Sequence, residues 1–109
     1  MDERRRAERV AVEVPARLWL GEGRCVDVVI RNVGVLGALL TMTDLEESVH
    51  EGERALLEHP RIVDGKAQKA VVRTPAAVVR VELDVERAGV VRQVALYFDG
   101  GPRPVGVAG

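Results

Sequence analysis

Apolar residues recur at every second position in short stretches of this sequence, and turn residues separate the stretches. From Val10 to Leu20, valine, alanine and leucine alternate with glutamate, arginine and tryptophan. This period of two is typical of a strand with one buried face. Similar patterns, or short valine-rich runs, occur at 24–31, 36–42, 53–59, 70–84 and 90–99. About six short strands with turns between them predict an all-β sandwich or barrel.

Glycine, proline and asparagine mark the breaks between these stretches. Asp64-Gly65 is a hairpin signal. Pro15 predicts an edge, a bulge or a sheet corner, because proline cannot donate a ladder hydrogen bond, and we expect Pro75 to bend or split the strand over 70–84. The segment 43–52 is compatible with one helical turn capped by Thr43 or Asp44 and equally with a loop.

The length of 109 residues suits one domain with one core. We expect a flexible, arginine-rich arm over 1–9 and a β-domain over 10–99. The stretch 100–109 contains four glycines and two prolines with almost nothing to bury, and this composition predicts a disordered tail.

Charge and composition exclude several classes of function. The formal net charge of −1 gives no global attraction for a nucleic acid polymer or an anionic membrane, and the aromatic content of 3% is too low for a single-strand stacking platform. No apolar run approaches the ~20 residues that a membrane helix requires, so direct membrane insertion is not expected. The single cysteine excludes an intramolecular disulfide, and a cytoplasmic location follows as the default.

The sequence contains no catalytic or metal-binding constellation. His50 and His59 are nine residues apart, have no cysteine partner and match no metal-ligand spacing, so surface or loop positions are expected for both. Cys25 is expected to be a small, partly buried strand residue without a histidine and acid beside it. We therefore expect neither an enzyme nor a cofactor.

Two spaced motifs carry the functional signal. Arg5 and Arg9 form R-x-x-x-R directly before the first strand, and Asn32, Gly34 and Gly37 form N-x-G-x-x-G in the turn between the second and third strands. With this order and spacing the sequence resembles the PilZ domain family over residues 3 to about 99. That resemblance implies a small antiparallel six-stranded β-barrel, and many members of the family bind the bacterial messenger cyclic di-GMP.

The resemblance also implies a mechanism. The arm folds over the barrel when cyclic di-GMP arrives, Arg5 and Arg9 hold guanine and phosphate, and Arg4 and Arg6 are further candidates. Guanidinium groups suit both targets, because they form forked contacts with a guanine edge or a phosphate. The turn supports the other side of the ligand, and ordering of the arm creates a surface for an unidentified downstream protein.

Within the turn, Asn32 can read a guanine edge or stabilise the turn through its own backbone. Gly37 is expected to serve the backbone more than the ligand. Glycines in such a turn are also expected to supply left-handed backbone.

Gly34 departs from the family pattern, which has serine at this position. Loss of the hydroxyl should cost about 0.5–1.5 kcal/mol, or up to ~3 kcal/mol if its partner is a phosphate. We expect the backbone N–H of Gly34 to remain able to approach an anion. The alternative is a nucleotide-blind PilZ-like adaptor that acts through protein contacts, and an RNA-binding barrel is a remote third reading.

Overall fold

The computed structural model of the chain describes residues 10–87 and 89–105, without the side chain of residue 22. Within this range the chain contains strands and one short 3₁₀ turn, η1 (Gly21–Gly23). The strands are β1 (Val10–Trp19), β2 (Cys25–Val33), β3 (Gly37–Met42), β4 (Arg54–Val63), β5 (Lys66–Glu86), β6 (Gly89–Phe98) and β7 (Arg103–Pro104).

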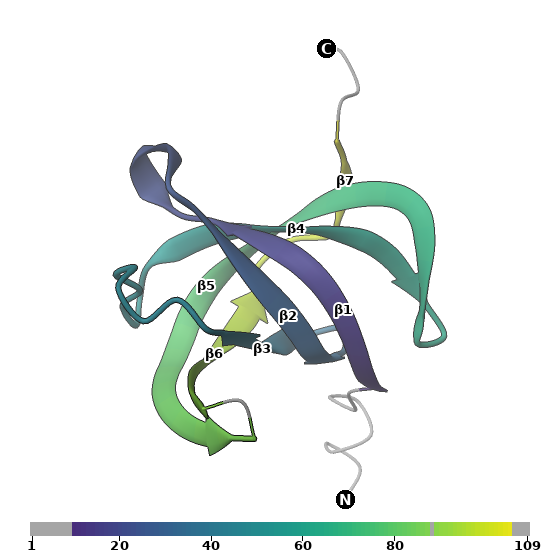
Figure 1. Ribbon diagram of the computed structural model, residues 1–109. Helices are drawn as coiled ribbons and strands as arrows, with labels where there is room; N and C mark the ends of the chain where they lie inside the picture. Colours follow the sequence, from purple (N-terminus) through teal and green to yellow (C-terminus); the bar gives the residue numbers. More distant parts are fainter. Residues whose placement is uncertain (1–9, 88, 106–109) are drawn as a thin grey trace, which may run out of the picture.

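The six long strands close into a ring (Figure 1). Their order is β4-β1-β2-β3-β6-β5, all neighbours are antiparallel, and β4 pairs with β5 to complete the circle. The prediction of an all-β, six-stranded antiparallel barrel-like fold is therefore confirmed. The additional strand β7 is two residues long and pairs with β5 outside the ring.

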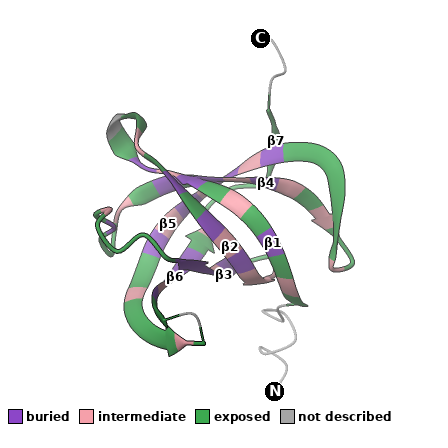
Figure 2. Ribbon diagram, in the orientation of Figure 1, coloured by how far each residue is buried: buried purple, intermediate pink, exposed green. Residues whose placement is uncertain are grey.

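The core fills the inside of the ring, because alternate residues of every long strand point inward. Figure 2 shows this alternation as purple bands along the strands. Fully burying one such side chain contributes about 1.5–3 kcal/mol relative to leaving it in water. The largest completely buried side chains come from all six long strands: Leu18, Ile30, Leu40, Met42, Leu57, Val78, Val94 and Leu96.

The seam between β1 and β4 is the shortest in the ring. Only Arg17, Leu18 and Trp19 of β1 have Cα partners on β4. The outer side of this short seam is held by Glu58, whose Oε1 accepts hydrogen bonds from Trp19 Nε1 at 3.1 Å and from Arg73 Nε at 2.9 Å. The Arg73 guanidinium also lies 5.2 Å from the centre of the Trp19 ring, within cation–π range. The ring is therefore closed at one end of this seam and open over residues 10–16.

Pro15 and Pro75 both lie within strands. Pro15 follows a register shift of β1, between Ala11 and Val14, in the part of the strand that has no partner on β4. Of the two effects expected of Pro75, a bend or a split, the split does not occur, because β5 runs unbroken through Pro75, and its register shift against β6 lies later, between Val78 and Arg80. The Pro75 carbonyl accepts a hydrogen bond from the Asp99 amide at 3.1 Å, so the missing N–H faces the chain beyond the end of β6.

The segment between β3 and β4 is a loop and not a helical turn. Asp44 Oδ1 accepts hydrogen bonds from the amides of Glu46 and Glu47, as in an Asx turn. At the other end of the chain, the described residues of the predicted tail, 100–105, include β7, and the Val105 amide donates to the Val71 carbonyl. Disorder over the rest of the tail stays a prediction.

Candidate functional site

A cavity of about 750 Å³ opens at the end of the ring where β1 begins and β2 ends. It lies where β1 and β4 are not paired, because β1 residues 10–16 and the last part of β4 diverge there. Its size falls in the range of small-molecule sites, which is about 300–1,000 Å³. The short seam thus produces a ligand-sized hollow at one end of a filled ring.

The walls of this end cavity are mostly apolar. Val10, Val33, Ile62 and Phe98 line it from four different strands, with Gly34 and Val35 of the β2–β3 turn at its edge. A few polar side chains, namely His59, Arg61, Asp64 and Thr74, complete the lining. Apolar walls with a few polar groups are typical of a site that binds a flat organic ligand.

His59 lies in the wall as a structural group. The side chain is buried, against the expectation of a surface histidine, and its Nδ1–H donates to the Pro60 carbonyl at 2.7 Å. A neutral ring then leaves Nε2 to accept from the Thr74 hydroxyl at 3.0 Å. Burial lowers the pKa of His59 below its ordinary value of 6.5, which favours this neutral form.

Arg61 is the cation of the cavity that sequence reasoning missed. We expected the fourth strand to end before Pro60, but β4 continues to Val63. Arg61 lies between Pro60 and Ile62, which pair with Val71 and Ala67, so the extra residues of the bulge opposite Arg61 belong to β5. The exposed Arg61 lines the cavity, and within the described ranges it has no ion-pair partner.

The hairpin after Arg61 follows the sequence prediction. Asp64 and Gly65 both have positive φ, 53° and 78°, as a two-residue hairpin turn requires. The sequence indicated this hairpin turn, but nothing in it indicated that Arg61 lines the cavity.

The β2–β3 turn is built differently from the expectation. Neither Gly34 nor Gly37 has positive φ, so the turn needs no left-handed backbone at these two positions. The Gly34 N–H donates to the Gly37 carbonyl at 2.9 Å, and the Leu36 carbonyl accepts from the Phe98 amide at 2.8 Å. The expected role of the Gly34 amide as a free anion donor is wrong, because the turn itself uses this group.

Gly37 is required by strand packing. An added Cβ would lie 2.1 Å from the Leu96 carbonyl oxygen, where β3 and β6 run side by side. This close backbone approach agrees with the expectation that Gly37 serves the backbone. The glycine at the end of the motif therefore has a complete explanation without a ligand.

The structure brings only part of the predicted site to the cavity. Gly34 lines it, whereas Asn32 and Gly37 do not. Asn32 is half-buried and follows a register shift of β2, opposite Ala11 and Leu39. The predicted ligand contacts of these residues stay predictions.

The predicted arginine residues, Arg4, Arg5, Arg6 and Arg9, lie outside the described residues. The first described residue, Val10, has Val33 as its Cα partner and lines the cavity. Val10, the residue that follows the arginine segment in the sequence, thus lies at the edge of the cavity, beside the β2–β3 turn.

Two searches of the described part of the chain gave no site of another kind. Among these residues, no group of three or more His, Cys, Asp or Glu side chains could hold a metal ion. No helix within the same residues is long and apolar enough to cross a membrane.

Comparisons with known proteins place the fold. No family model matches the sequence, and no curated protein matches it. Solved structures do match, among them the PilZ domain with c-di-GMP of YcgR from Escherichia coli and the Bacillus subtilis inhibitor of motility MotI/DgrA.

The YcgR domain matches with a TM-score of 0.70 at 13% identity, over 89% of this chain and 79% of that one. MotI/DgrA matches with a TM-score of 0.67 at 18% identity, over 89% of this chain and 43% of that one. These TM-scores confirm the prediction of a PilZ-like fold, and at identities this low the likeness shows the fold alone.

Proposed function

We propose that this PilZ-like domain binds cyclic di-GMP at the end cavity and changes its surface on binding to control a downstream protein. The observation that carries the proposal is the position of Val10. It joins the arginine segment to the β-domain at the edge of a cavity of about 750 Å³, beside the motif turn. The likeness to the c-di-GMP-bound YcgR domain supports this choice of ligand.

The ligand has two phosphates and two guanines, so a receptor needs cations and flat apolar surfaces. Arg9 is bonded to Val10, and Arg5 is four residues earlier. In the proposal these two arginines contact guanine and phosphate from the β1 side. Arg4 and Arg6 are further candidates for contacts with the ligand. Arg61 supplies a guanidinium from the β4 side of the same cavity.

The β2–β3 turn contributes shape more than hydrogen bonds. Gly34 carries no hydroxyl, and its N–H is bonded within the turn. A missing hydroxyl contact is equivalent to a loss between a few-fold and ~100-fold in affinity. We therefore propose micromolar or weaker binding that depends on the arginines.

Titration calorimetry with cyclic di-GMP tests this function. We expect the wild type to bind, and Arg5→Ala, Arg9→Ala and Arg61→Ala each to lose at least about tenfold, since one bidentate arginine contact with guanine contributes ~1–3 kcal/mol. Gly34→Ser should tighten binding by restoring a hydroxyl.

The matched control is Arg87→Ala. Arg87 is exposed at the β5–β6 turn and is absent from the cavity lining. Equal losses in Arg87→Ala and Arg61→Ala would mean that only general charge matters, and they would refute the proposed site.

A second candidate function is a nucleotide-blind adaptor that acts through protein contacts. The occupied Gly34 amide and the mostly apolar cavity favour it, because both leave few groups for a phosphate. The absence of heat at high cyclic di-GMP concentration in the wild type would select this function. Binding that then appears in Gly34→Ser would identify the missing hydroxyl as the cause.

A further inference from the structure

A second hollow lies at the opposite end of the ring. The loop from β3 to β4 crosses this end, and a depression of about 440 Å³ separates it from β5 and β6. Leu45, Val49, Val81 and Leu83 supply its apolar lining. Because neighbouring strands are antiparallel, the end of β3 and the start of β4 lie away from the end cavity at the start of β1.

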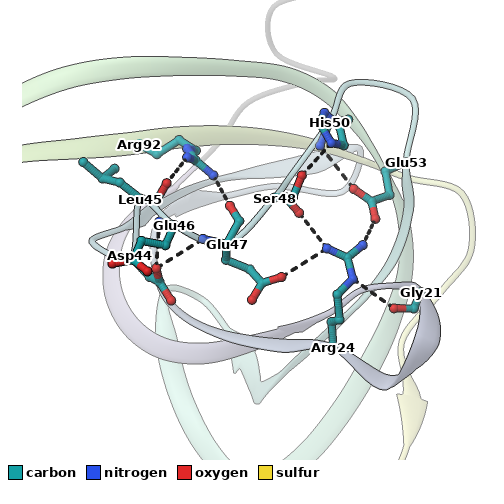
Figure 3. Close-up of polar contacts among 10 residues, drawn as sticks. All are labelled: Gly21, Arg24, Asp44, Leu45, Glu46, Glu47, Ser48, His50, Glu53 and Arg92. Atoms are coloured by element: carbon teal, nitrogen blue, oxygen red, sulfur yellow. Dashed lines mark hydrogen bonds and ion pairs between the residues drawn. The ribbon is translucent and has the colours of Figure 1, made fainter.

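The loop that borders this hollow is firmly held (Figure 3). Arg24 Nη1 donates to Glu47 Oε1 at 3.1 Å and to the Ser48 carbonyl at 2.8 Å, and Arg24 Nη2 pairs with Glu53. From the other side, Arg92 donates to the carbonyls of Leu45 and Glu47. The hollow is therefore preformed and needs no rearrangement of the loop to accept a partner.

An apolar strip continues from the hollow along the β5–β6 hairpin. Val81 packs on the core, and Leu83 and Val85 follow on the same face of β5 because the register is regular there. Val90 lies opposite Val85 on that face. Leu83, Val85 and Val90 are 68%, 76% and 48% exposed. The inner face of the ring thus extends beyond the part that the loop covers, as the curled hairpin in Figure 1 shows.

Carboxylates border this docking strip, which we define as Leu45, Leu83, Val85 and Val90. Glu46 and Glu51 are exposed beside it without an ion pair in the described part of the chain. Arg24 faces two carboxylates, Glu47 and Glu53, so this cluster also keeps a negative charge. Arg92, which lies opposite Leu83 on the same face and donates only to carbonyls, offsets one of these charges. The four glutamates of the loop against Arg24 and Arg92 still leave the border of the strip with a net negative charge.

We propose that the docking strip binds a basic amphipathic segment of a partner protein. The apolar side chains of such a segment cover the strip, and its lysines or arginines meet the glutamates of the loop. A second copy of this chain fits poorly, because two identical strips would bring their acidic borders together. This surface is separate from the nucleotide site, so the proposal does not depend on cyclic di-GMP binding.

The test uses the full chain without nucleotide and two synthetic peptides of about 18 residues. One is an amphipathic peptide of leucine and lysine, and the other has glutamate in place of lysine. We expect the lysine peptide to bind and to shift the amide NMR signals of the docking strip. Val85→Ser should weaken binding at least about tenfold, whereas Val35→Ser, a matched change at the end cavity (82% exposed), should not.

The charge contribution has its own pair of variants. Glu46→Gln combined with Glu51→Gln should weaken binding and reduce its salt dependence, and Asp27→Asn, at an exposed position of β2 outside the hollow, should leave both unchanged.

Three results would overturn the proposal. The first is no binding of the lysine peptide, and the second is equal binding of the two peptides, which would indicate general apolar adhesion. The third is self-association in sedimentation that Val85→Ser abolishes, which would assign the docking strip to a second copy of the chain.

Discussion

Substitution of Gly37 by alanine separates the structural role of the motif turn from a role in ligand binding. The new Cβ would lie 2.1 Å from the Leu96 carbonyl oxygen, whereas Cβ atoms essentially never approach another heavy atom within 3.0 Å. The backbones of β3 and β6 would have to separate by about 1 Å. A backbone atom cannot avoid the contact by changing a rotamer, so the ladder itself must move.

The expected cost follows from two contributions. Overpacking in a well-packed interior costs about 1–3 kcal/mol. The end of the β3–β6 ladder would also weaken, by ~1 kcal/mol for each hydrogen bond lost. One of these is the hydrogen bond that the Phe98 amide donates to the Leu36 carbonyl. Together these give a loss of about 2–4 kcal/mol in the free energy of unfolding, a large part of the stability of a domain of this size.

Urea unfolding followed by circular dichroism measures this loss. With a slope of about 2 kcal/mol per molar urea, in the middle of the typical range, the midpoint should fall by roughly 1–2 M. Gly21→Ala is the matched control, since no atom lies within 4 Å of its added Cβ and its φ is not positive, so its midpoint should stay or rise slightly. A Gly37→Ala protein with the wild-type midpoint would refute the packing argument, all the more so if its cyclic di-GMP affinity fell.

Two further predictions concern titration and loop order. Burial lowers the pKa of His59 below 6.5, so below that pH protons bind the unfolded chain in preference to the folded one, and unfolding becomes easier as the pH falls toward the lowered pKa. Chemical unfolding over this pH range should show the loss in the wild type and in His50→Gln but not in His59→Gln, and a loss retained in His59→Gln would contradict this assignment. Arg24→Gln should speed amide hydrogen exchange over 43–53, because it removes the ion pairs of the loop with Glu47 and Glu53. The control Arg54→Gln, which breaks only the pair with Asp99, should leave this exchange unchanged. Unchanged exchange in Arg24→Gln would show that Arg24 does not order the loop.

The strands were predictable because their pattern is local. Alternation along 10–20 and 24–31 already separates the inward from the outward residues, and Asp64-Gly65 marks a hairpin through its backbone preferences alone. The path of β4 past Pro60 was not predictable in this way. A strand can contain a proline where the missing N–H is not needed for a ladder hydrogen bond. Whether this holds at Pro60 depends on how β4 pairs with β5, and that pairing is a property of the assembled sheet.

The cavity was hidden for a related reason. It depends on the short seam between β1 and β4, whose three residue pairs join positions about 40 apart in the sequence. Nothing in either strand alone indicates that pairing stops at Arg17. Arg61 therefore carried no functional signal in the sequence, although it lines the same cavity as Gly34.

The glycines of the motif turn carry less functional information than their spacing implies. Gly37 is fixed by the approach of β6, and the amide of Gly34 closes the turn on the Gly37 carbonyl, so a nucleotide-blind adaptor with this fold would need the same backbone. The turn alone cannot distinguish a receptor from an adaptor. The distinction rests on arginine side chains outside the turn, namely Arg5 and Arg9, which precede β1 in the sequence, and the exposed Arg61 on β4. A loss of ligand affinity on removal of these three guanidinium groups, with the free energy of unfolding unchanged, would assign them to binding.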